Sequence, residues 1–291
     1  MMRILDTYPD FLAYWEKYQD RDIEEQVRGW ADEYMFNYPE LLDRQKKDYR
    51  DMELDWREVA AERVFPHLGE RVEQMSRARS LLSVVIEPVH KTAADVFEMD
   101  DLEILYVIYV GIGCGAGWVT GLEGSPAVLL GLENIAECGW TEADSLKGLV
   151  AHELGHAIHG LLRNDPELAG GGGPFWQLYT EGFAQRCEHR IMDRDSWSVG
   201  KGLNSSDWLQ WCHSNRSWLA GEFLQAVEME EDVRPFFGSW YQLRGRSHCG
   251  HYLGHQVILE LEKNTDMLTI AQISDIESAI TGVLETFITA G

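Results

Sequence analysis

The chain has 291 residues, and its 49 acidic against 25 basic side chains give a formal net charge of −24 at pH 7. Hydrophobic residues make up 45% and charged residues 25% of the chain, which is typical of a globular protein with a sizeable core. Nucleic acids and anionic membranes are bound through basic patches, so such an acidic chain predicts neither as a partner.

The first part of the sequence predicts helices, and the N-terminus together with the cysteines predicts an intracellular protein. Residues 1–82 mix charged and aromatic side chains at helical spacing. The stretch from Met1 to Asp6 turns polar at once, which is not typical of a secretory signal. The five cysteines form no CxxC pair, and such a scattered set is typical of a reducing compartment. We therefore expect a cytoplasmic protein.

Residues 103–133 predict a small sheet. Three runs of apolar, β-branched and aromatic residues lie at 105–110, 117–120 and 127–130. The glycines between these runs mark turns. The most apolar stretch, 104–120, is too short and too rich in glycine to predict a membrane span.

A helix expected over about 142–162 carries the sequence His-Glu-Leu-Gly-His at 152–156. This is an HExxH motif, with which zinc hydrolases hold a metal and activate water. The spacing of four brings His152 and His156 to one face of the helix, about one turn apart, so both rings can reach one ion. Glu153 follows the first of them and is not needed as a ligand, which suits a general base.

A catalytic zinc usually takes three protein ligands and keeps one position open for water. The pattern HExxHxxGxxH is ruled out, because His159 and Leu162 stand where it requires glycine and histidine. A glutamate from a following helix is the other common third ligand. Glu181 offers one, in a segment at about 175–193 that predicts a helix.

The surroundings of Glu181 favour this role. The glycines and the proline at 170–174 allow the chain to reverse between the two helices. Gly182 is small enough to let the second helix approach the HExxH helix closely. Two other carboxylates compete: Glu167 lies in the Pro- and Gly-rich connection, where a ligand is held less rigidly, and Glu188 lies two turns further along the same helix.

Two of these segments, HELGH at 152–156 and EGFA at 181–184, resemble the gluzincin branch of zinc metallopeptidases, which includes thermolysin-like and aminopeptidase-like enzymes. The resemblance implies a zincin-like catalytic domain that holds one zinc ion per chain. It also implies that His152, His156 and Glu181 are the zinc ligands and that Glu153 is the base.

A third segment, Gly-His-Tyr-Leu-Gly-His at 250–255, is similar to a Gly-Tyr-x-x-Gly-Tyr segment of a bacterial family of predicted zinc-dependent proteases. Aminopeptidases of the gluzincin branch carry at the matching position a tyrosine that stabilises the oxyanion. Here that position is His251, with Tyr252 beside it. Either side chain can donate a hydrogen bond to a developing alkoxide, so we expect His251, or else Tyr252, to do so.

The resemblance also bears on substrate binding. In zincins the strand before the HExxH helix forms the edge of the cleft, so we expect the strand at 126–131 to take up a peptide by strand addition. The sequence Gly-Leu-Glu-Asn that begins at Gly131 is similar to the Gly-x-Met-Glu-Asn motif with which aminopeptidases hold a substrate amine, although it lacks the methionine. It implies Glu133 as an amine anchor; a carboxylate at a turn or helix N-terminus is the alternative.

These features together predict an α+β protein. Residues 1–95 would form a helical N-terminal extension, and residues 96–291 a zincin-like catalytic domain with a small mixed sheet, ligand-bearing helices and a helical C-terminal part. The expected function is a zinc-dependent peptidase that acts on a peptide substrate, with Glu153 as general base. A zinc hydrolase of a non-peptide amide and a non-catalytic zinc-containing binding protein remain as alternatives. Substrate sequence and oligomeric state stay open.

Overall fold

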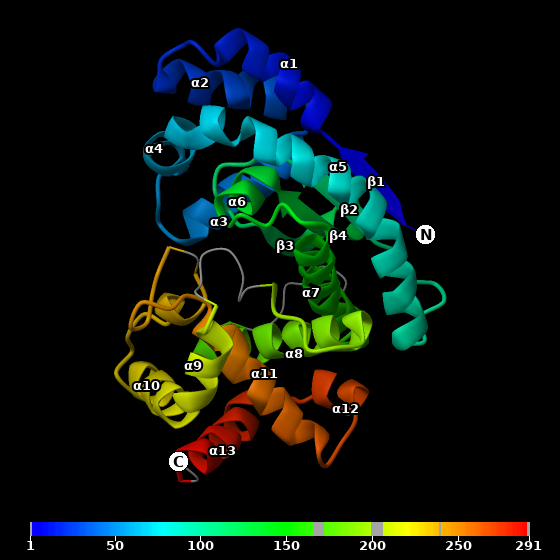
Figure 1. The fold of residues 1–291 in the computed structure, drawn as a ribbon, viewed down its shortest axis with the longest axis vertical. Coiled ribbons are helices and arrows are strands. Elements are labelled where there is room, and N and C mark those ends of the chain that lie inside the picture. Colours follow the sequence, from blue (N-terminus) through cyan, green and yellow to red (C-terminus); the bar gives the residue numbers. More distant parts are fainter. Residues whose placement is uncertain (1, 166–171, 199–205, 239, 290–291) are drawn as a thin grey trace. The chain divides into compact units, whose positions relative to one another are not determined.

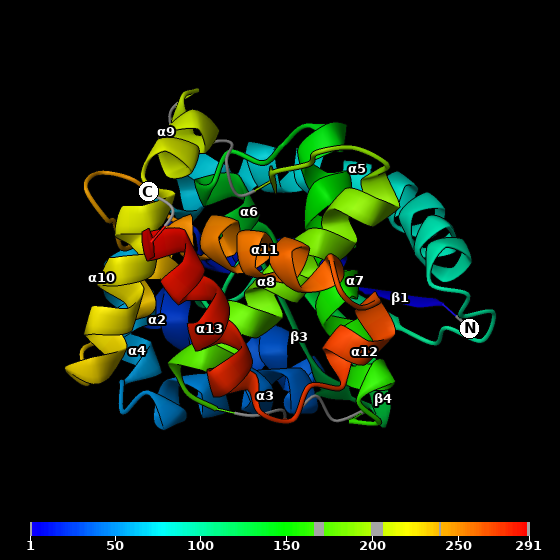
Figure 2. The same cartoon turned by 90° about the horizontal axis from the view of Figure 1, so that it is seen from below.

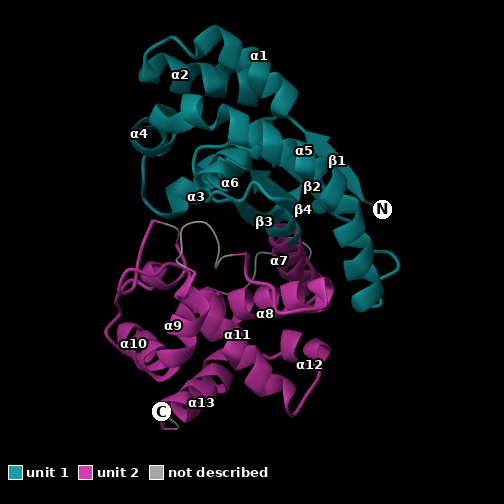
Figure 3. Ribbon diagram, in the orientation of Figure 1, with its two compact units in different colours: residues 1–147 teal, residues 148–291 magenta. Residues whose placement is uncertain are grey.

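The protein has a mostly helical α+β fold with one small mixed sheet (Figure 1). The structure is a computed structural model that describes residues 2–165, 172–198, 206–238 and 240–289. The chain divides into two compact units, Met1–Lys147 and Gly148–Gly291 (Figure 3). The predicted division into domains 1–95 and 96–291 stays a prediction.

The sheet belongs to the first unit. Its four strands are β1 (Arg3–Asp6), β2 (Leu105–Tyr109), β3 (Gly117–Leu122) and β4 (Ser125–Gly131). Their order is β1-β2-β4-β3; β1 and β4 run parallel to β2, whereas β3 is antiparallel to β4. The three predicted strands are confirmed. The sequence did not predict β1, because four residues are too few to show an alternating pattern.

The sheet order corrects the expectation that a peptide adds to the strand at 126–131. β4, the strand that precedes the HExxH helix, lies inside the sheet: its Leu129 is paired with Val107 of β2 on one side and with Trp118 of β3 on the other. An interior strand has all its backbone groups in ladders, so β4 cannot take up a peptide by strand addition. The tight β3–β4 hairpin is the reason, since it places β3 outside β4 as the edge strand.

Helices and helical turns fill the rest of the first unit. They are α1 (Tyr8–Tyr18), α2 (Ile23–Gly29), the π-helix η1 (Trp30–Tyr34), the 3-10 helix η2 (Met35–Asn37), α3 (Pro39–Asp51), α4 (Trp56–Val59), the π-helix η3 (Ala60–Val64), α5 (Phe65–Val96) and α6 (Leu132–Glu137). Buried aromatic side chains join them to the sheet. Trp30, for example, is fully buried, and its indole N–H donates to the carbonyl of Val110 at the end of β2, at 2.9 Å.

The second unit is helical. It contains most of α7 (Ala143–Leu162), then α8 (Pro174–Met192), α9 (Trp208–Ser214), α10 (Arg216–Glu228), the 3-10 helix η5 (Arg234–Phe236), α11 (Cys249–Glu262), α12 (Met267–Ala271) and α13 (Ile276–Thr289). The predicted helices at 142–162 and 175–193 are confirmed as α7 and α8. α8 packs most extensively against α11 and also contacts α13 (Figure 2). Among the described residues, no helix has both the length and the apolar character needed to cross a membrane.

Candidate metal centre

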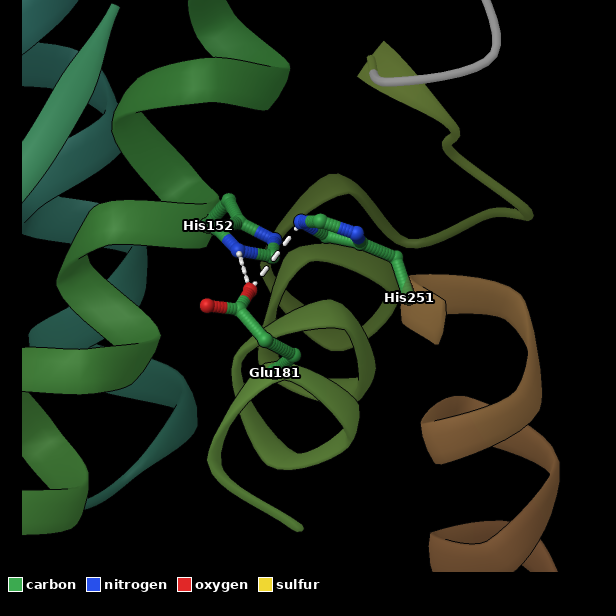
Figure 4. A group of neighbouring side chains, drawn as sticks. All are labelled: His152, Glu181 and His251. Atoms are coloured by element: carbon green, nitrogen blue, oxygen red, sulfur yellow. Dashed lines mark hydrogen bonds and ion pairs between the residues drawn. The ribbon is translucent and has the colours of Figure 1, made fainter. Parts of the chain in front are cut away.

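Three helices of the second unit bring ligand groups to one point (Figure 4). His152 comes from the middle of α7, Glu181 from α8 and His251 from the first turn of α11. The Oε2 atom of Glu181 lies 3.2 Å from His152 Nε2 and 3.1 Å from His251 Nε2. All three ligand atoms lie within 4.8 Å of one another, and both histidines are buried. This group could hold a metal ion.

His156 lies at the margin of this group. Its Nε2 is 3.5 Å from the same Oε2 of Glu181, and its ring centroid is 5.0 Å from that of His152, as the spacing of four on one helix predicts. The group whose ligand atoms all lie within 4.8 Å nevertheless contains His251 and not His156. The role of His156 as a ligand therefore stays a prediction.

The donor set fits a metal ion in two respects. Imidazole nitrogens with a carboxylate oxygen are ligands that zinc prefers, and on a tetrahedral zinc neighbouring ligand atoms would lie about 3.3 Å apart. The measured separations from Glu181 Oε2, 3.1–3.5 Å, fall around that value. Three imidazole rings also converge on this one carboxylate oxygen. A cation among the four groups could bind all of these atoms at once.

Opposite charges dominate the centre. Burial by itself raises the pKa of Glu181, but the imidazoles of His251 and His156 outweigh it and hold that pKa well below its usual range. Burial by itself lowers the pKa of His152, yet the adjoining carboxylates of Glu181 and Glu188 raise it. The carboxylate of Glu181 and the imidazole of His152 therefore stabilise each other's charged form.

Glu153 lies beside this centre but is not one of its ligand side chains. Its side chain is buried, and its Oε2 has no hydrogen-bond partner among the residues that the structure describes. Burial raises the pKa of this carboxyl, and the neighbouring imidazoles of His156 and His152 partly offset the rise. The general-base role of Glu153 stays a prediction at this point.

Glycines let the three helices approach closely enough for the ligands to meet. A Cβ on Gly182 would lie 2.3 Å from the backbone of Gly254 in α11, and a Cβ on Gly254 would lie 2.3 Å from the carbonyl of Leu178 in α8. Gly182 therefore faces α11, whereas the sequence had led us to expect that it faces α7. The contact between α7 and α8 depends on Gly155, within the HExxH motif, whose Cβ would lie 2.7 Å from the Cα of Ala184.

The structure places the other predicted site residues elsewhere. The hydroxyl of Tyr252 lies 2.9 Å from His213 Nδ1 on α9, and Tyr252 is not part of the ligand group. Glu167 lies outside the described residues. Glu188 is buried behind His152, where its oxygens accept hydrogen bonds from serine and glutamine groups. These contacts favour Glu181 over Glu188 as the carboxylate that reaches a metal.

Glu133 belongs to the first unit. Its carboxylate is fully buried at the start of α6 and accepts the backbone N–H groups of Gly111 and Gly113, at 2.7 and 3.3 Å. Burial raises its pKa to about 7, even though these amides favour the charged form. The observed contacts are those of a carboxylate that holds the loop after β2, and its role as an amine anchor stays a prediction.

Sequence reasoning singled out His251 only as a hydrogen-bond donor to the oxyanion. Its membership of the ligand group was missed, because no local spacing relates it to His152 or to Glu181. The paired glycines Gly182 and Gly254 were the available signal, since small residues on two helices allow a close crossing.

No family model matches this chain, and no curated protein or solved structure compared with it gives a significant match.

Replacing Gly182 with alanine should weaken the centre. The new Cβ meets backbone atoms of Gly254 that cannot move aside without separating α8 from α11. We expect the free energy of unfolding to fall by about 1–3 kcal/mol and zinc binding to weaken as His251 moves away. Thermal unfolding and zinc titration would measure both effects.

Gly221→Ala in α10 is the matched control, since its Cβ would meet nothing within 4 Å. It should be neutral or stabilise the protein by about 0.5–1 kcal/mol. Equal behaviour of the two variants would contradict the close helix contact.

Replacing Glu133 with glutamine should change how stability depends on pH. A folded-state pKa of about 7 means that the folded protein binds a proton more tightly than the unfolded chain, whose carboxyl keeps its ordinary value of 4.5. Stability from this group is therefore highest below pH 4.5 and falls as pH rises to 7. Relative to the wild type, E133Q should gain about 3 kcal/mol over this interval. Urea unfolding at several pH values would measure the difference, and parallel curves would contradict the assignment.

Proposed function

We propose that the chain is a zinc-dependent hydrolase that cleaves peptide bonds. The observation that carries this proposal is the buried Glu153 carboxylate, which lies next to His152 in sequence and has an oxygen without a hydrogen-bond partner in the described part of the chain. A purely structural zinc site needs no such group. The side chains of His156 and Glu181 keep 20% and 21% of their surface exposed, so these two residues are in part open to solvent.

The ligands would be His152, Glu181 and at least one further imidazole. The sequence motif favours His156, and the observed group favours His251. When bound, the zinc ion would polarise the scissile carbonyl and lower the pKa of a water molecule to about 7. The proposal includes the zincin-like character of the domain that the motif implies.

Glu153 would accept the proton of the attacking water on its free oxygen and return it to the leaving amine. Its raised pKa suits both transfers, because a base that is too weak does not take the proton, and one that is too strong does not release it. The imidazole that does not bind the metal, His251 in the motif-based assignment, would donate its N–H to the tetrahedral oxyanion.

Glu153→Gln should leave zinc binding intact and abolish most of the hydrolysis. Glutamine keeps the size of the side chain but cannot accept the proton, so we expect turnover to fall by about 10²- to 10⁴-fold. A fluorogenic peptide library would measure turnover, and elemental analysis would measure zinc. Glu262→Gln is the control, because that carboxylate pairs with Arg186 and does not belong to the centre. Full activity of E153Q would make the mechanism wrong.

His156→Ala and His251→Ala, made in parallel, should separate a ligand from an oxyanion donor. Loss of a ligand lowers the zinc content of the purified protein. Loss of the donor leaves the zinc content unchanged and reduces kcat by about 10²- to 10³-fold. The motif predicts zinc loss for H156A and a kcat loss for H251A, whereas the observed ligand group predicts zinc loss for H251A.

A non-catalytic zinc protein is the second candidate, and one observation favours it. Four side chains, His152, His156, Glu181 and His251, lie close enough to close the coordination shell and leave no place for water. Zinc loss in both of the variants above, together with no turnover on any peptide or amide by the wild type, would support this candidate.

A further inference from the structure

A second carboxylate stands behind His152, on the side of the ring that faces away from Glu181. It belongs to Glu188, two turns along α8 from Glu181, and its side chain is fully buried. Glu188 Oε2 lies 3.7 Å from His152 Nδ1. That ring nitrogen has no hydrogen-bond partner among the described residues. The imidazole thus lies between two carboxylates, one at each nitrogen.

Glu188 is held in place from several directions. Its Oε1 accepts the hydroxyl of Ser196 at 2.7 Å and the backbone N–H of Ser198 at 3.1 Å. Its Oε2 accepts the amide of Gln185 at 2.9 Å and the hydroxyl of Ser198 at 3.2 Å. Four donors on one buried carboxylate fix its position and prevent it from turning.

The backbone of α7 is shaped to fit this carboxylate. A Cβ on Gly148, one turn before His152, would lie 2.8 Å from Glu188 Oε1, so only glycine leaves room there. The fixed position of Glu188 also explains why it does not compete with Glu181. The carboxylate meets the Nδ1 side of His152, not the Nε2 side where the ligand atoms gather.

We propose that Glu188 is the positioning residue of the metal centre: it accepts the Nδ1–H of His152 and so presents the Nε2 lone pair to the ion. The separation of 3.7 Å is longer than a hydrogen bond, so the proposal requires these two atoms to move closer when a metal is bound. The charge of Glu188 would also make the imidazole a stronger donor to the ion. The inference rests on the metal centre of the proposed function and not on the peptidase reaction.

Glu188→Gln tests it through metal affinity. A glutamine keeps the shape but not the charge, and loss of such a partner weakens metal binding by about 10- to 100-fold. Competition with a chromophoric zinc chelator would measure the affinity of the purified 291-residue chain. Glu262→Gln is the matched control, since it removes a half-buried carboxylate of the same unit that pairs with Arg186 and not with His152. It should bind zinc like the wild type.

Nitrogen-15 spectra of the zinc-loaded protein supply a readout that general damage to the fold would not move. In the wild type, His152 should show a protonated Nδ1 whose hydrogen exchanges slowly with water. In E188Q this exchange should be faster, and in E262Q it should be unchanged. Unaltered affinity and unaltered Nδ1–H exchange in E188Q would overturn the inference.

Ser198→Ala is a second variant, which tests the inference even if E188Q does not fold. It removes one hydroxyl donor and leaves the backbone N–H of residue 198 in place. It should weaken zinc binding in the same direction by a smaller factor, and an unchanged affinity would count against the inference. Loss of hydrolysis plays no part in these outcomes, so an active E153Q would overturn the peptidase and leave the role of Glu188 standing. A wild type that binds no zinc would overturn both.

Discussion

A single carboxylate oxygen, Oε2 of Glu181, is the point on which the second unit converges. Imidazoles from α7 and α11 lie 3.1–3.5 Å from it, so one negative charge from α8 is shared among three rings. Burying a charged group costs free energy unless the group is paired with an opposite charge. Separating the three helices would therefore leave the Glu181 carboxylate without its partners. This pairing requires α8 to stay packed against both α7 and α11.

Small residues make the constraint physically possible. Gly155 lies where α7 meets α8, and Gly182 and Gly254 lie where α8 meets α11. Each is a helix-interior glycine and therefore costs helix stability, by about 1 kcal/mol relative to alanine. The cost is offset because the helices come near enough for side chains from all three to meet at Glu181. A metal that neutralises the cluster would link its binding to the stability of the whole unit.

The centre is arranged in layers around His152. Glu181 meets its Nε2, Glu188 approaches its Nδ1, and the serines at 196 and 198 hold Glu188 in turn. Glu153 lies outside this chain of contacts, buried and with an unused oxygen. Both oxygens of Glu188 accept hydrogen bonds, whereas one oxygen of Glu153 has no partner among the described residues, and the two roles proposed above rest on this contrast.

Local sequence determined the helices α7 and α8, the three longer strands and the placement of His152 and His156 on one helix face. Each of these follows from periodicity within a few turns, and Glu181 was found from its helix and the glycine beside it. Only the tertiary structure decided that β4 is interior, that Gly182 faces α11, and that His251 joins the ligand group while Tyr252 turns to His213. These outcomes depend on which elements distant in sequence pack together, and the spacing of residues within one element carries no information about that choice.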